Sequence, residues 1–147
     1  MKYVGKNIPR NDGFDKATGL GQFTMDVSMP HMLYARVLRS PYAHAKVVKI
    51  DTSAAEALPG VVTVCTFENT TNKPFNTSAT MVTTPRPAEP VRDQTIFTDE
   101  PKYIGDEVAA VAAETEAIAA EAIKRIKVEY EVLPAVYDPV EALKPDS

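Results

Sequence analysis

The chain has 147 residues, of which 44% are hydrophobic, enough for one domain with a buried core but too few for two. Its 16 basic and 20 acidic residues give a net charge of −4 without any long basic cluster, which argues against nucleic-acid binding. No apolar stretch is long enough to cross a bilayer and no signal-peptide pattern opens the chain, so we expect a soluble, cytoplasmic protein that does not contact a membrane.

The start of the chain, to about residue 27, is rich in Gly, Asn, Asp and Lys. Asn11 or Asp12 can cap a short helix that stops at Gly19. This composition predicts an N-terminal arm that docks on another surface. We expect residues 1–147 to form a single domain that carries this arm.

Three strands are predicted in the first half of the chain, at residues 32–39, 46–50 and 61–65. The first has alternating side chains and ends before Pro41. The last contains the only cysteine, Cys65, which can form no internal disulfide. Its place in the apolar run VVTVCTF predicts a buried thiol. Ser53 and Glu56 have the S-x-x-E spacing of a capping box, which predicts a short helix between the second and third strands.

Residues 69–101 are rich in Thr, Asn and Pro and are predicted to form a long irregular loop. We expect residues 70–94 to be its most irregular part, because this composition has little apolar surface to bury. Two interpretations remain open for the loop, a solvated insertion and a functional segment that folds against another domain.

The strongest local pattern covers residues 103–143. An apolar run at 108–113 predicts a strand buried on both faces, and Thr115 can cap the helix that follows. The helix has one apolar stripe, and from residue 128 the period changes to two, which predicts a strand with one solvated face. Together the patterns predict an α+β fold, a mixed β-sheet with strand-helix-strand units and helices packed on one face. Each crossover should be right-handed if it is parallel. The residues of the apolar stripe are Ile118, Ala119, Ala122, Ile123 and Ile126.

No combination of residues points to catalysis or metal binding. The two histidines, His31 and His44, have no metal-ligand spacing, and neither a phosphate-binding loop nor a Ser-His-Asp arrangement is present. Asp106 and Glu107 are adjacent on a predicted strand and therefore point to opposite faces, so they do not form an acid/base pair. We predict no catalytic, cofactor-binding or metal-binding residue in the chain.

Almost the whole chain resembles the α/β hammerhead domain of the molybdenum hydroxylases, the xanthine dehydrogenase and aldehyde oxidase family. The resemblance rests on five segments in combination, and one departure from it is Phe23, where the family has a tyrosine. The five segments are VGKNIPRNDGFDKATG at 4–19, MLYARVLRSPYAHAKV at 32–47, LPGV at 58–61, YIGDEVAAVAAET at 103–115 and VEYEVLPAV at 128–136.

The resemblance implies a non-catalytic structural domain at the N-terminus of a large subunit. The full enzyme would hydroxylate a heteroaromatic carbon or an aldehyde, with molybdopterin-bound molybdenum, iron–sulfur clusters and FAD as cofactors. Its partners would be the molybdopterin-binding catalytic domain and the iron–sulfur and FAD domains or subunits. The pterin-binding groups and the catalytic glutamate lie outside the matching segments, so the chain alone is expected to carry no cofactor and to be inactive.

A candidate docking or channel surface follows from the same motifs. We expect its residues to form one contiguous surface at strand ends, with the catalytic domain supplying the partners of Arg39. The alternative is a stand-alone binding or scaffold module with the same fold, and a self-contained hydrolase that uses His44 and an Asp is the least favoured interpretation. The surface comprises Arg39, Ser40, Pro41, His44, Ile104, Gly105 and Asp106.

Overall fold

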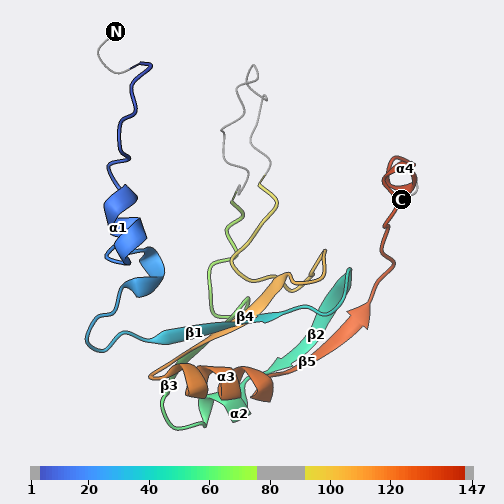
Figure 1. Cartoon of the computed structure of the whole chain (residues 1–147). Coiled ribbons are helices and arrows are strands. Elements are labelled where there is room, and N and C mark those ends of the chain that lie inside the picture. The colour runs from blue at the N-terminus through green and yellow to red at the C-terminus, as the bar shows by residue number, and fades with distance from the viewer. Residues whose placement is uncertain (1–3, 76–91, 145–147) are drawn as a thin grey trace. The chain divides into compact units, whose positions relative to one another are not determined.

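The computed structural model describes residues 4–75 and 92–144 (Figure 1). The chain divides into two compact units, Met1–Met32 and Leu33–Ser147. In the first unit, helix α1 (Gly13–Thr18) ends at Gly19, which adopts the left-handed conformation with φ of 77°, and a 3₁₀ turn, η1 (Thr24–Asp26), follows. None of its described residues is buried.

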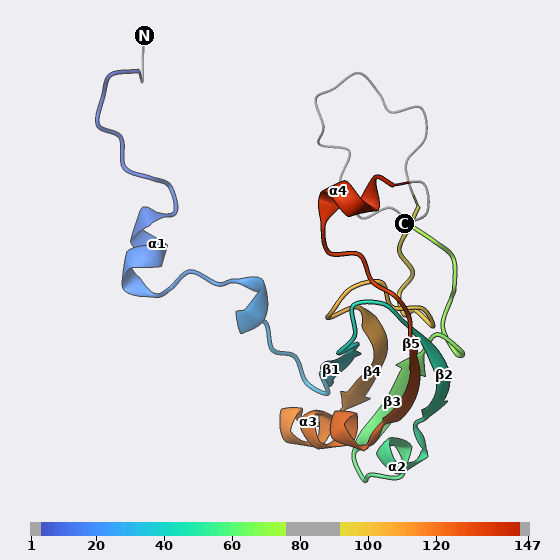
Figure 2. The same ribbon diagram turned by 90° about the vertical axis from the view of Figure 1, so that its right-hand side faces the viewer.

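The second unit contains two antiparallel sheets. The three-stranded sheet has the order β1 (Tyr34–Arg39), β4 (Glu107–Ala113), β3 (Val61–Thr66). The two-stranded sheet pairs β2 (Ala45–Asp51) with β5 (Lys127–Val132) and lies beside the first (Figure 2). The strands predicted from periodicity are therefore all present. Cys65 is only partly buried, which corrects the expectation of a buried thiol, because β3 lies at the edge of its sheet.

The predicted strand-helix-strand units each connect one sheet to the other. Helix α2 (Ser53–Glu56) leads from β2 to β3, and helix α3 (Glu116–Arg125) leads from β4 to β5. Every described strand pair is antiparallel, so the predicted mixed sheet is instead two antiparallel sheets and the handedness rule for parallel crossovers does not apply. The α+β class, with both helices on one side of the three-stranded sheet, is confirmed (Figure 1).

Strand β4 is central because it is apolar and carries small side chains. Val108, Ala109, Val111 and Ala113 are fully buried, as the uninterrupted apolar run predicted. Ala109 of β4 and Ala122 of α3 belong to the same core cluster, so α3 packs on this strand through small side chains. Buried residues of β3, β4 and both helices form the main core, namely Ala55, Val64, Ala109, Val111, Ala122 and Ile126.

Helix α3 begins and packs as its sequence predicts. Thr115 lies in an extended conformation, and its hydroxyl accepts a hydrogen bond of 3.2 Å from the amide of Ile118. Ala119 and Ala122 are fully buried in the stripe, whereas Ile123 is half-buried and packs at the margin of the core. The predicted sheet-facing stripe is therefore confirmed, with the two alanines at its centre.

The start of α2 differs from the predicted capping box. Thr52, not Ser53, is the residue before the helix, and its hydroxyl donates to the Glu56 carboxylate at 2.7 Å. Ser53 lies inside the helix and donates to Asp51 at 2.6 Å. This bond lowers the pKa of the Asp51 carboxyl. The S-x-x-E spacing was misleading because Asp51 accepts the hydrogen bond of the Ser53 hydroxyl, so Ser53 does not cap the helix.

The remaining segments are the long connection between β3 and β4 and the chain after β5. In the flanks of the predicted loop, 69–75 and 92–101, the described residues contain no helix or strand, only an isolated bridge between Phe75 and Gln94. The centre of the segment expected to be most irregular, residues 76–91, lies outside the described part of the chain. After β5 the chain ends in a short helix, α4 (Pro139–Ala142), capped by Asp138.

Gly60, between α2 and β3, offers a direct test of the packing between this turn and α3. Its φ is +87°, and a Cβ atom there would lie 2.6 Å from Cδ1 of Ile118. We expect Gly60→Ala to destabilise the protein by about 1–3 kcal/mol, because it strains the backbone and displaces the isoleucine. Urea denaturation measures this change in the free energy of unfolding.

The matched control is Gly105→Ala, since Gly105 has a φ of +99° but no atom within 4 Å of the added Cβ. This variant carries the backbone strain without the steric contact. Gly60→Ala should therefore be the less stable of the two. Equal stabilities would show that Ile118 does not pack against the turn as described.

Candidate docking surface

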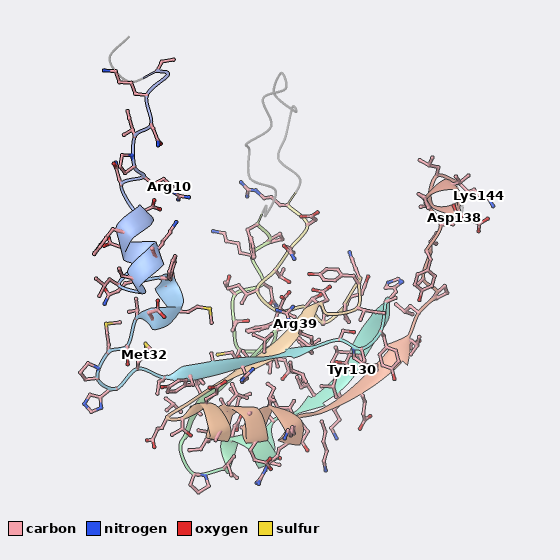
Figure 3. The ribbon with its side chains drawn as sticks, in the orientation of Figure 1. Arg10, Met32, Arg39, Tyr130, Asp138 and Lys144 are labelled. Carbon is pink, nitrogen blue, oxygen red and sulfur yellow. The ribbon has the colours of Figure 1, made fainter. Side chains whose placement is uncertain are left out.

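Arg39 ends β1, next to an irregularity of the β1–β4 register between Leu38 and Arg39 (Figure 3). Its guanidinium donates to the Gly105 carbonyl at 2.6 Å and to the Glu107 carboxylate at 2.5 Å. Arg39 thus finds both of these partners within its own unit, which corrects the expectation that another domain supplies them. Its side chain is nevertheless half exposed.

Backbone hydrogen bonds join the two motifs of the candidate surface. The amide of Ser40 donates to the Asp106 carbonyl and the amide of Gly105 donates to the Ser40 carbonyl, both at 2.8 Å. The Ser40 hydroxyl is turned inward, where it bonds to the backbone of Tyr42. Segments 39–41 and 104–106 are therefore adjacent in space, although more than sixty residues separate them in the chain.

Asp106 is buried, with only 8% of its surface exposed. Its carboxylate accepts hydrogen bonds from the amides of Lys102 at 2.9 Å and Glu107 at 3.1 Å. These two bonds and its burial hold the carboxylate in the turn and leave little of it exposed to a partner. Of the predicted docking residues, Ser40 and Asp106 are thus buried and support the surface through their hydrogen bonds.

His44 lies immediately before β2 and links three segments. Its Nδ1 atom donates to the Pro134 carbonyl at 2.7 Å, while Nε2 lies 3.6 Å from the Glu100 carboxylate. The His44 carbonyl accepts from the amide of Leu133 at 3.0 Å. The imidazole is therefore a cross-link between the start of β2 and the chain that leaves β5.

An open cavity of 620 Å³ adjoins His44 and Ile104. Its rim carries exposed apolar side chains, with 68% of Ile104 and 81% of Tyr137 accessible to solvent. Sequence reasoning missed the contribution of residues 134–137, because the period-two pattern of β5 ends before them and nothing local shows that an apolar run will stay exposed. The cavity is lined by Ala43, His44, Glu100, Lys102, Tyr103, Ile104, Pro134, Ala135, Val136 and Tyr137.

Tyr103 contributes to this cavity and to a second, polar one of 910 Å³ that also includes Asp106. The hydroxyl of Tyr103 accepts a hydrogen bond from Gln94 at 3.0 Å. Desolvation, followed by the negative charge of Asp106, raises the pKa of the Tyr103 hydroxyl above its usual value. The phenol is therefore protonated at neutral pH and does not serve as a base.

The described residues do not offer a ligand set for a metal-containing cofactor. Within 4–75 and 92–144, no three or more His, Cys, Asp or Glu side chains are grouped so that they could hold a metal ion. All buried side-chain nitrogen and oxygen atoms in these ranges have a hydrogen-bond partner. An iron–sulfur cluster is held by several cysteine thiolates, and the chain has one cysteine. None of the helices in these ranges is long and apolar enough to span a membrane.

The comparison with protein families gives one match, to the domain described as "Aldehyde oxidase and xanthine dehydrogenase, a/b hammerhead domain", over residues 18–134. The chain belongs to this family. Most of the matched residues lie in the second unit, where the candidate docking surface is found.

Relatives with curated names are much longer than this chain. The chain is 40% identical over 138 residues to a probable xanthine dehydrogenase subunit of Bacillus subtilis, covering 94% of this chain but 17% of the relative. It is 38% identical to the carbon monoxide dehydrogenase large chain of Hydrogenophaga pseudoflava, covering 88% of this chain and 15% of that one. The hammerhead chain thus spans about a sixth of these relatives.

Solved structures of such enzymes contain the same fold. Quinoline 2-oxidoreductase from Pseudomonas putida 86 superposes with a TM-score of 0.80 at 33% identity, over 98% of this chain and 18% of that one. The Cu,Mo-CO dehydrogenase gives a TM-score of 0.83, also at 33% identity, over 97% of this chain and 17% of that one. The resemblance to molybdenum hydroxylases is therefore confirmed in both sequence and fold.

Proposed function

We propose that this chain is a non-catalytic structural domain of a molybdenum hydroxylase, which packs on the molybdopterin-binding catalytic part and helps shape substrate access. The proposal is supported by family membership together with the small share of each relative that the domain covers. The complete enzyme uses molybdopterin-bound molybdenum, iron–sulfur clusters and FAD, and the domains or subunits that hold them are its partners.

The observation that carries the docking role is the exposed apolar rim around His44. Exposed apolar side chains that gather at one cavity are typical of interaction sites. They are held by a rigid base, because the Ser40–Asp106 and His44–Pro134 bonds fix the three segments to one another. We assign the docking surface to this rim, enlarged by residues 134–137. Its exposed apolar members are Tyr103, Ile104, Val136 and Tyr137.

The test is Ile104→Asp in the complete enzyme. A carboxylate placed in a dry interface loses water without gaining a partner, so we expect the molybdenum content or the specific activity to fall roughly tenfold or more. The same substitution in this chain alone should leave its thermal stability nearly unchanged, because Ile104 is exposed there. The effect on substrate access is measured separately from these two quantities, by comparing the KM for a small substrate with the KM for a large one.

Val48→Asp is the matched control, because Val48 is also an exposed aliphatic residue but lies in β2, outside the rim. It should change neither cofactor content nor activity. The proposal is wrong if Ile104→Asp and Val48→Asp enzymes are both as active and as fully loaded with molybdenum as the parent.

A further inference from the structure

The outer edges of both sheets expose backbone groups that could pair with another strand, and three of the four edges have visible protection. Strand β1 carries two arginines, Arg36 and Arg39, and β5 carries three charged residues. Residues 99–101 cover the outer side of β2, where the amides of Val47 and Ala45 donate to the carbonyls of Asp99 and Pro101. Charges and covering loops are the usual means of preventing edge-to-edge association.

Strand β3 lacks these protections. Its sequence, VVTVCT, has neither a charge nor a proline and is rich in β-branched residues. No strand within the described ranges pairs with its outer edge, and Val62 is 55% exposed. A register shift between Val61 and Thr63 interrupts the first half of the strand, so the regular half, Val64–Thr66, is the part that could accept a neighbour.

The side chain of Asn69 occupies this regular half. Its Oδ1 atom accepts a hydrogen bond of 2.8 Å from the Thr66 amide, and its Nδ2 atom donates one of 2.9 Å to the Val64 carbonyl. A side-chain amide has the same donor and acceptor as a peptide group, so Asn69 makes the two bonds that an adjacent strand would make. The turn after β3 holds it there, since the Asn69 amide donates to the Thr66 carbonyl at 3.3 Å.

We infer that Asn69 protects the outer edge of β3 from pairing with a second copy of this chain. Two copies of β3 can meet in antiparallel fashion about a two-fold axis, in which each copy offers the same groups to the other. Because β3 is uncharged, no repulsion opposes this contact. In this contact the Thr66 amide of each copy would donate to the Val64 carbonyl of the other, so the two Cys65 residues would lie opposite one another at the two-fold axis.

The decisive variant is Asn69→Ala, which frees the Val64 carbonyl and the Thr66 amide without adding bulk. Sedimentation velocity over a range of protein concentrations should show self-association roughly tenfold or more stronger than in the parent, as two new hydrogen bonds between the copies would give. Asn72→Ala, the same substitution at an exposed asparagine outside β3 and its turn, should sediment like the parent.

Two further variants separate edge pairing from loss of local structure. Adding Cys65→Lys to Asn69→Ala should restore the parent's sedimentation, because the two lysines would face one another directly at the axis and repel, while no bond within one copy is regained. Asn69→Asp keeps only the acceptor for Thr66 and adds a charge, so it should lose stability in a thermal melt without associating. The inference is overturned if Asn69→Ala sediments like the parent, or if Cys65→Lys fails to reverse its association.

Discussion

Ala122→Asp should lower the free energy of unfolding by at least about 3 kcal/mol, a large part of the stability of a typical domain. Ala122 is fully buried on α3, in the core cluster that includes Val64 and Val111. A carboxylate at this position has no cation within the cluster, so it must either stay unpaired or be protonated at a cost. A thermal melt followed by circular dichroism should show a fall in Tm of about 10 °C or more.

Ala117→Asp is the matched control because it introduces the same side chain on the same helix. Ala117 is exposed in the first turn of α3, where a negative charge interacts favourably with the helix dipole. We expect its stability to stay within about 0.5 kcal/mol of the parent. Similar melting curves for Ala122→Asp and Ala117→Asp would mean that α3 does not pack on the sheet through this face.

Asp106→Ala should be nearly as damaging, with an expected loss of about 2–5 kcal/mol. The substitution leaves the amides of Lys102 and Glu107 without the carboxylate that now accepts their hydrogen bonds. The turn they form also carries Gly105, to which Arg39 and Ser40 are bonded. Chemical denaturation of this chain alone measures the effect.

Asp106→Asn should fall between the parent and Asp106→Ala, because its single oxygen can accept one of the two bonds. Asp99→Ala serves as the control, since Asp99 is exposed and joins the β2 edge through its backbone carbonyl. If Asp106→Ala unfolds at the same denaturant concentration as Asp99→Ala, the buried carboxylate does not stabilise the turn. A clear difference would establish that Asp106 supports the docking surface from within.

The sequence was sufficient to predict the elements that depend on near neighbours in the chain. Thr115 caps α3 through a residue three positions away, and the buried stripe of that helix follows from its period. Strand β4 was predicted from its uninterrupted apolar run. Family membership was also predicted, because the five motifs that carry it are read directly along the chain and need no knowledge of the residues they contact.

Which residues meet across the fold was decided only by the tertiary structure. Antiparallel pairing divides the strands between two sheets, a choice that depends on contacts between residues far apart in the chain. The same long-range contacts bury Ser40 and Asp106, give Arg39 its partners and leave Ile104 exposed. The hydrogen bonds of Asn69 join residues that are close in the sequence, but its inferred role at the edge can be seen only once β3 is known to be an edge strand. The periodicity of a strand does not show whether a neighbouring strand covers it.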